Sequence, residues 1–175
     1  MPDDRLDVIA FGCTSGTMAI GPERVHAAIG AARRGVLVTD PVSAALRGFA
    51  ALGCRRVALL TPYIGEVNAV VETFLIARGL DLVRKGYFPL QDDNARARVT
   101  PDALEAAAVA LGDDPAVGAL FISCTALRSA PMVVRLEARI GRPVVTSNQA
   151  LCWDALRLMG DRRATPQGGR LFGCA

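Results

Sequence analysis

The chain has 175 residues, of which 51% are hydrophobic, so it can bury a sizeable core and is not expected to be disordered. Its net charge is only +3 and its aromatic content is 5%, which argues against binding to nucleic acid. The apolar runs are shorter than the roughly 20 residues that span a bilayer, and the acidic N-terminus is unlike a signal peptide, so we expect a cytoplasmic protein with no membrane segment.

Short apolar runs alternate along the chain with longer amphipathic stretches, a pattern typical of βα units and a parallel sheet. We expect strands at residues 7–12, 36–39, 57–61, 81–86, 118–123 and 143–146. Helices are expected after Gly21, Asp40 and Thr100, because each is a tolerated or preferred N-cap followed by a proline. The clearest helix is 66–79, whose apolar residues recur on one face and whose end coincides with Gly79.

Two segments far apart in the chain are similar to each other. VLVTDPVSAALRGFAALGCRR begins at Val36, and PVVTSNQALCWDALRLMGDRR begins at Pro143. Their Val-Thr, Gly and Arg-Arg elements match at one constant offset. Each segment is preceded by a strand that ends in Cys-Thr, at Cys13 and at Cys124. This series in the same order indicates an ancestral duplication, and hence two similar lobes.

The two halves of this repeat differ in what precedes them. Two further βα units, from Val57 to about Pro115, lie before the second Cys-Thr strand, whereas only MPDDRL lies before the first. If the halves are equivalent, roughly 60 residues are missing from the front of the chain. We therefore expect residues 1–53 to be the remnant of a truncated N-terminal lobe. Residues 54–175 would form the second lobe, with the last helix packing back on the first.

The two Cys-Thr pairs are expected at the edge where parallel sheets bind ligands. Ligands bind outside the carboxyl ends of the strands, where helix N-termini offer free N–H groups and a partial positive charge. The hydroxyls of Thr14, Ser15 and Thr125 could then hold a carboxylate or an enolate oxygen. A helix N-terminus also favours the thiolate form of a cysteine. Two such thiols, Cys13 and Cys124, could act on opposite faces of one carbon.

A single cysteine at a strand end is more often a small apolar filler than a reactive group. Its occurrence at equivalent places in both halves favours the reactive interpretation here. The other three cysteines are interpreted as fillers or bystanders: Cys54, Cys152 and Cys174. Without a C-x-x-C pair, and with one histidine, His26, interpreted as a helix-flank residue, the chain is not expected to hold a metal or a disulfide framework.

Two further residues are candidates for binding a substrate. Tyr63 ends the strand 57–61 and could offer a phenol donor over the site, although a surface aromatic is the competing interpretation. Asn94 follows a strand within a polar cluster and could bind a carboxylate, although a solvated loop is the competing interpretation. The glycines of GCTSGT do not form a phosphate-binding loop, because no Gly-Lys-Ser/Thr follows them.

Four motifs together carry a family resemblance: DVIAFGCTSGT, ALLTPYIGEVN, LFISCTALRSA and PVVTSNQALCWDALRLMG. They resemble the aspartate/glutamate racemase superfamily, and within it the branch of maleate cis-trans isomerase, arylmalonate decarboxylase and the ectoine-utilisation proteins. The resemblance extends from about Asp7 to Gly160. It implies an α/β fold of two pseudo-symmetric flavodoxin-like lobes with parallel sheets, no cofactor, and a site between the lobes.

The resemblance also implies roles for single residues. Cys13 would attack the double bond of maleate as a thiolate, and Cys124 would donate the proton. Five residues match carboxylate-binding positions: Thr14, Ser15, Tyr63, Thr125 and, within one residue of register, Asn94. Arylmalonate decarboxylases lack the first cysteine, so its presence here argues against that activity.

We therefore expect a cofactor-independent isomerase of a small dicarboxylate. An amino-acid racemase or an ectoine-catabolism enzyme of the same superfamily is the alternative within the enzyme class. A truncated, non-catalytic anion-binding module is the alternative outside it. A homo-oligomer is also expected, from the family likeness and from apolar surface that a missing front would leave uncovered.

Overall fold

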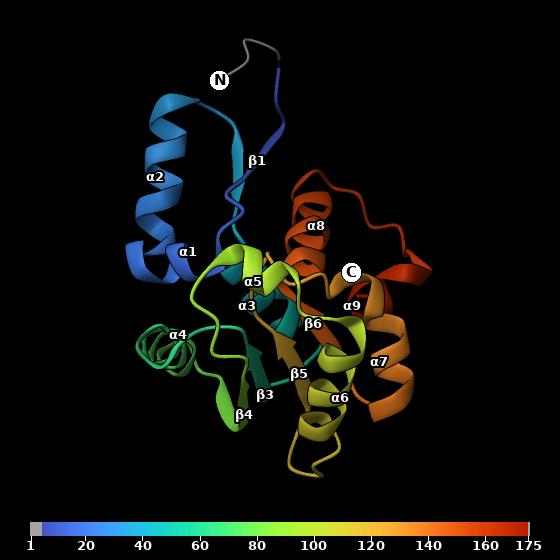
Figure 1. Ribbon diagram of the computed structural model, residues 1–175. Coiled ribbons are helices and arrows are strands. Elements are labelled where there is room, and N and C mark those ends of the chain that lie inside the picture. Colours follow the sequence, from blue (N-terminus) through green and yellow to red (C-terminus); the bar gives the residue numbers. More distant parts are fainter. Residues whose placement is uncertain (1–4, 175) are drawn as a thin grey trace.

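The computed structural model describes residues 5–174 and contains two parallel sheets (Figure 1). β1 (Val8–Ala10) and β2 (Leu37–Thr39) form a two-stranded sheet. The second sheet has the order β4-β3-β5-β6, and its strands are β3 (Arg56–Thr61), β4 (Asp81–Tyr87), β5 (Ala119–Ile122) and β6 (Val144–Thr146). All six strands lie where the apolar runs predict them, and the parallel α/β fold is confirmed.

Helices connect the strands, as parallel pairing requires. They are α1 (Thr14–Ile20), α2 (Pro22–Ala32), α3 (Pro41–Ala51), α4 (Gly65–Ala77), α5 (Asp93–Ala97), α6 (Pro101–Gly112), α7 (Val133–Ile140), α8 (Ser147–Leu158) and α9 (Gly169–Phe172), with 3₁₀ turns at Ala130–Met132 and Pro166–Gly168. The predicted caps are present, since Asp40 accepts from two backbone N–H groups of α3 and Thr100 accepts from one of α6. α4 stops just before Gly79, whose φ of +87° suits glycine.

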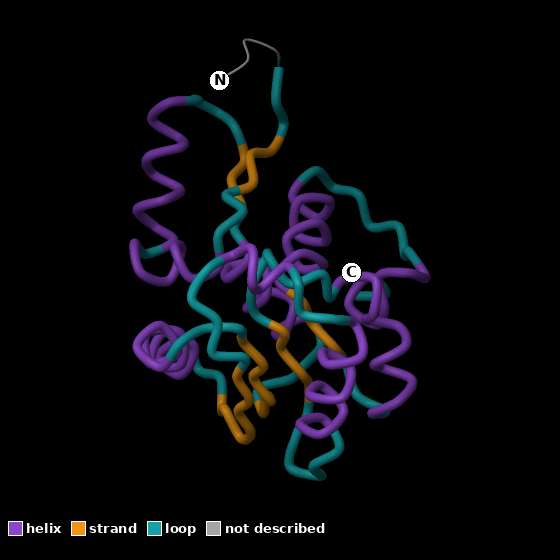
Figure 2. Tube along the Cα trace, viewed as in Figure 1, coloured by secondary structure: helices purple, strands orange, loops and turns teal. Residues whose placement is uncertain are grey.

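The four-stranded sheet is covered on both faces. In Figure 1, α4 lies to one side of the sheet and α6 and α7 lie to the other, and Figure 2 shows the same layers by element type. β3 from Val57 onward, β5 and β6 are buried, as expected for strands packed on both faces. The rings of Phe49 on α3 and Phe121 on β5 meet edge to face with centroids 5.6 Å apart, which joins α3 to this sheet.

α3 and α8, the helices of the two repeat segments, pack against each other. Arg47 of α3 makes two hydrogen bonds of 2.5 Å to the carboxylate of Asp154 on α8. Thr39, at the end of β2, donates to the same carboxylate. α8 also contacts β1, β2 and β6, so this helix connects the small sheet to the large one. The division of the chain at residue 53 stays a prediction.

Replacing Asp154 by alanine is expected to lower the free energy of unfolding by about 2 kcal/mol, because it leaves Thr39 and one end of Arg47 without their partner in a nearly dry site. The figure is set below that of a fully buried pair, because the Arg47 side chain is 46% exposed. Urea unfolding measures the change. As a control, Asp161→Asn alters a surface pair with Arg163 and should change stability much less.

β1 occupies a different position in its sheet from β5, the strand that matches it in the repeat. β5 lies between β3 and β6, whereas within residues 5–174 the one strand that pairs with β1 is β2. The other edge of β1 therefore presents backbone N–H and C=O groups that another strand could pair with.

Within residues 5–174, the structure contains no helix with both the length and the hydrophobicity that a membrane span requires.

Candidate active site

The two Cys-Thr pairs lie at the carboxyl ends of corresponding strands. Cys13 follows β1, is the N-cap residue of α1 and is exposed. Cys124 follows β5 and is buried. α1 begins at Thr14, so the Cys13 side chain stands at a helix N-terminus, as predicted. The second half differs, because a loop with a 3₁₀ turn, and not a helix, follows Cys124 directly.

Gly16 leaves room for the Cys13 thiol. A Cβ atom at position 16 would lie 2.8 Å from the Sγ of Cys13, closer than such atoms approach in proteins. The sulfur therefore lies against the first turn of α1, where the helix dipole stabilises negative charge. A side chain at position 16 would force the sulfur away from this place.

The Gly16→Ala variant is expected to slow alkylation of Cys13 by iodoacetamide about 3- to 10-fold, because the added Cβ would displace the thiol from its accessible place at the first turn of α1. Mass spectrometry of a tryptic digest gives the rate for each cysteine. Gly30→Ala in α2 is the matched control, because a Cβ there meets nothing within 4 Å. Equal Cys13 rates in all three proteins would contradict this account of Gly16.

Hydrogen bonds bring the two Cys-Thr segments together. The hydroxyl of Thr125 donates to the backbone oxygen of Gly12 over 2.8 Å. The hydroxyl of Thr14 donates to Oγ of Ser147 over 3.0 Å, and the backbone N–H of Cys124 donates to the same oxygen over 3.0 Å. Residues far apart in the sequence thus meet at one edge of the two sheets. The catalytic roles of the cysteines stay a prediction.

Cys124 has an unusual backbone conformation. Its φ is +151°, and among residues 5–174 it is the one residue other than glycine with a positive φ. Such conformations cost free energy and persist only where surrounding contacts hold them, which is common at functional sites. The N–H of Cys124 is held by Ser147, and the carbonyl of the next residue, Thr125, accepts from the side chain of Asn148 over 3.0 Å.

Tyr63 is a buried residue, so the surface interpretation of this aromatic is wrong. It is 2% exposed and follows β3. Burial raises the pKa of its phenol, and the neighbouring Cys124 raises it further, whereas Ser15 and Arg96 act in the opposite direction. The phenol therefore stays protonated at neutral pH and remains a hydrogen-bond donor. The side chain of Asn68 holds this segment by donating to the Tyr63 carbonyl over 2.7 Å.

Ser15 and Asn94 have different surroundings. Ser15 is half-buried in the first turn of α1. A hydrogen bond with Ser15 lowers the pKa of the Tyr63 phenol, so Ser15 lies in the same region as the cysteines. Asn94 is exposed in the first turn of α5, and its role as a carboxylate ligand stays a prediction. α5 reaches Tyr63 through another residue, since the guanidinium of Arg96 lies 5.2 Å from the centre of the Tyr63 ring.

Sequence reasoning missed two residues of this region, Ser147 and Asn148. Ser147 had a sequence signal, because it follows Thr146 as Asp40 follows Thr39 in the other repeat segment. Polar residues thus follow both Val-Thr strands at the ligand edge of a sheet. No comparable signal identified Asn148, whose contacts depend on how the Cys124 loop folds back over α8.

The remaining predicted bystanders lie apart from these hydrogen bonds. Burial raises the pKa of the Cys54 thiol, and Cys152 is exposed on α8. His26 binds the buried carboxylate of Asp40, with Nε2 and Oδ2 2.8 Å apart, so it is more than a flank residue. Within residues 5–174, no three His, Cys, Asp or Glu side chains cluster as a metal site.

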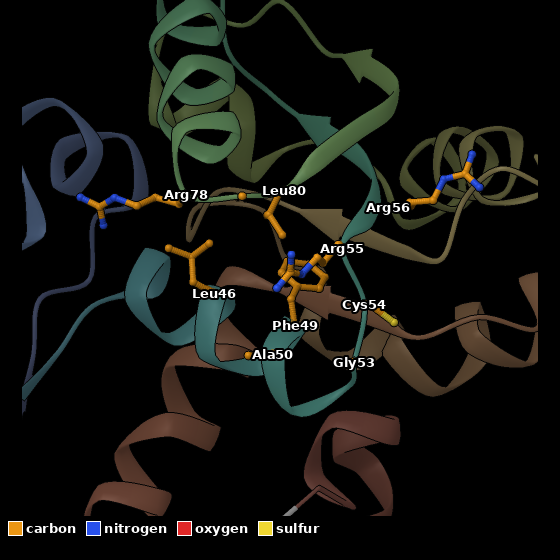
Figure 3. Close-up of a pocket in the computed structure, with 10 residues that line it drawn as sticks. Leu46, Phe49, Ala50, Gly53, Cys54, Arg55, Arg56, Arg78 and Leu80 are labelled. Carbon is orange, nitrogen blue, oxygen red and sulfur yellow. The ribbon is translucent and has the colours of Figure 1, made fainter.

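An open pocket of about 760 Å³ lies near the start of β3, at the opposite end of that strand from Tyr63. Leu46, Phe49 and Leu80 give it an apolar lining. Figure 3 shows the side chains of Arg56 and Arg78 extending away from each other, and they pair with Asp81 and Glu23. Arg55 is the one labelled arginine near the middle of this pocket in Figure 3, so no pair of charges converges there. The region of the two cysteines, where two thiols and several hydroxyls meet, is therefore the stronger candidate site.

Comparisons with known proteins identify relatives of this chain. Residues 22–172 match the family model for arylmalonate decarboxylase. The chain is 36% identical over 140 residues to the arylmalonate decarboxylase of Bordetella bronchiseptica, and this alignment covers 79% of this chain and 58% of that protein. It is 30% identical over 178 residues to the maleate isomerase of Nocardia farcinica, and this alignment covers 97% of this chain and 70% of that protein. The chain thus spans 58% of the length of the first relative and 70% of the length of the second.

Solved structures agree with these matches. A Nocardia farcinica maleate cis-trans isomerase variant, carrying serine in place of one cysteine and a covalently bound succinylcysteine intermediate, superposes with a TM-score of 0.89 at 28% identity. The match covers 95% of this chain and 71% of that one. An arylmalonate decarboxylase structure gives a TM-score of 0.82 at 32% identity, covering 95% of this chain and 75% of that one.

Proposed function

Because the chain belongs to the arylmalonate decarboxylase and maleate isomerase branch of the aspartate/glutamate racemase superfamily, we propose that it is part of a cofactor-independent isomerase that converts maleate to fumarate. The observation that carries the proposal is the meeting of two Cys-Thr segments through Ser147 at one edge of the sheets. The relative with a succinylcysteine intermediate supports the same chemistry.

In the proposed mechanism, the Cys13 thiolate adds to one alkene carbon of maleate. The new S–C bond forms as the π bond breaks, and the electron pair is delocalised into the carboxylate on the neighbouring carbon. The Cys124 thiol then gives its proton to that carbon. Rotation about the resulting single bond, return of a proton to Cys124 and expulsion of the Cys13 thiolate release fumarate.

The surroundings of the two thiols suit this division of work. Cys13 is exposed at a helix N-terminus, where negative charge is favoured. Cys124 is 5% exposed and lies beside the phenol of Tyr63, which stays protonated and uncharged at neutral pH. Ser15, Tyr63 and Asn94 are the proposed side chains for holding the two carboxylates. The hydroxyls of Thr14 and Thr125 donate to Ser147 and Gly12, so these two residues would contribute through their backbone N–H groups.

A direct assay tests the proposal. The protein is incubated with maleate, and fumarate is followed by proton NMR, with Cys152→Ala as a control because that cysteine is exposed away from the paired segments. Fumarate formation by both proteins is expected. If maleate remains unchanged, exchange of solvent deuterium into the α position of aspartate tests the racemase alternative, and an ectoine-derived acid is the next substrate.

Decarboxylation is the second candidate function. The family match and the 36% identity to an arylmalonate decarboxylase favour it. Incubation with phenylmalonate distinguishes the two activities, since a decarboxylase releases carbon dioxide and phenylacetate, whereas an isomerase has no alkene to act on. Phenylacetate without any fumarate from maleate would replace the isomerase proposal.

A further inference from the structure

Ser147 connects the two halves of the candidate site through one oxygen atom. It lies at the start of α8 and is fully buried, with 0% of its surface exposed. Its Oγ accepts the backbone N–H of Cys124 and the hydroxyl of Thr14, each over 3.0 Å. Thr14 directly follows Cys13 in the chain. The Ser147 side chain therefore contacts both Cys124 itself and the residue next to Cys13.

The corresponding residue of the other repeat segment does not make such contacts. Asp40 follows Thr39 as Ser147 follows Thr146, but its carboxylate accepts from the N–H groups of Val42 and Ser43 and binds His26. Asp40 therefore caps its own helix. Ser147 serves another purpose, because the cap of α8 is supplied by Thr146, which accepts from the N–H of Gln149.

The conformation of Cys124 explains why such a contact is needed. A φ of +151° is unfavourable for cysteine, and the backbone N–H of this buried residue needs a hydrogen-bond partner. The bond to Ser147 satisfies this N–H and fixes the backbone that carries the thiol. Loss of the bond would release the loop toward an ordinary conformation and move Sγ of Cys124.

We propose that Ser147 is a positioning residue that sets the geometry of Cys124 relative to Cys13 through its paired bonds to Cys124 and Thr14. It touches no reacting atom in this role. The kinetic consequence rests on the proposed isomerase function, because displacement of a catalytic group by about 1 Å can cost about 100-fold in rate. The structural consequence, a released Cys124, does not depend on the identity of the substrate.

Three variants separate positioning from general stability. Ser147→Ala removes the accepting oxygen. Ser147→Thr keeps the oxygen but adds a methyl group to a packed site, so it should lower the melting temperature. Thr146→Ala removes the cap of α8 without touching either cysteine segment, so it should also lower the melting temperature.

We expect Ser147→Ala to lower kcat for maleate about 10- to 100-fold with KM changed less than about threefold, while Ser147→Thr and Thr146→Ala keep kcat within about threefold of the parent. In parallel, iodoacetamide should label Cys124 at least about fivefold faster in Ser147→Ala alone, since the loop that buries it is released. Cys152 in the same digest calibrates the reagent.

The kinetic assay tests the isomerase function, and the labelling rates test the role of Ser147, so the two proposals can be contradicted independently. If the parent protein leaves maleate unchanged, the isomerase function fails, and the labelling pattern alone decides on Ser147. Faster labelling of Cys124 in Ser147→Ala, but not in Thr146→Ala, supports the positioning role. The positioning role is overturned if the labelling rate of Cys124 is unchanged in Ser147→Ala, or if it rises equally in Thr146→Ala. It is also overturned if kcat falls in proportion to the melting temperature across the three variants.

Discussion

Replacing Cys13 by alanine is expected to reduce the conversion of maleate to fumarate by at least about 1,000-fold, to the detection limit of the NMR assay. The reason is that Cys13 carries the proposed attacking thiol and is the exposed cysteine at the first turn of α1. Such losses are typical when the attacking group of a covalent mechanism is removed.

A matched control shows whether the effect is specific for Cys13. Cys152→Ala removes another exposed thiol, which lies on α8, and should retain full activity. Thermal unfolding of both variants should be close to that of the parent, because exposed cysteines contribute little to packing. Turnover by Cys13→Ala within tenfold of the parent would contradict the attack by this thiol.

Replacing Cys124 by alanine is the second large expected effect, with turnover lowered about 100- to 10,000-fold, which is the range for loss of a positioned acid. Tyr63 cannot take over this role efficiently, because burial and the neighbouring Cys124 raise the pKa of its phenol and keep its proton tightly bound. Steady-state kinetics in the same assay measure the change.

The Cys124 result has its own control. Because Cys124 is buried, alanine leaves a small cavity, and Cys54→Ala, at a partly buried thiol near the start of β3, shows the cost of removing a cysteine from the interior. Cys54→Ala should keep its turnover even if its stability falls. Equal losses of activity in the two variants would indicate a packing effect and not proton transfer.

The sequence predicted the strands well, because each one is a short apolar run bounded by turn or capping residues. β3 and β5 are buried along nearly their whole length, and such strands produce an unbroken apolar signal. Helix starts were predicted for the same kind of reason, since Asp40 and Thr100 cap the helices that follow them. These features depend on neighbouring residues in the chain, which a sequence displays.

The candidate site was predicted less completely. The repeat placed Cys13 and Cys124 at equivalent strand ends, but it could not show that Ser147 joins their surroundings, because that contact spans 133 positions between Thr14 and Ser147. The burial of Tyr63 likewise depends on packing between distant elements. The loop predicted around Asn94 is the short helix α5, whose Arg96 lies over Tyr63.

Residues at matching positions of the two similar segments make different contacts. Arg47 and Asp154 occupy matching positions on α3 and α8 and pair with each other across the contact between these helices. Asp40 and Ser147 also match, yet one caps a helix and the other holds the Cys124 backbone. The two cysteines thus lie at similar strand ends, and single polar residues make their environments unequal.

The most direct test of the two-cysteine account is a search for the covalent adduct. The Cys124→Ser variant is incubated with maleate and quenched in acid, and its peptides are analysed by mass spectrometry. We predict a modification on Cys13 with the mass of one added maleic acid, absent from Cys54, Cys152 and Cys174. An unmodified Cys13, or equal modification of Cys13 and the exposed Cys152, would contradict attack by the thiol at the start of α1.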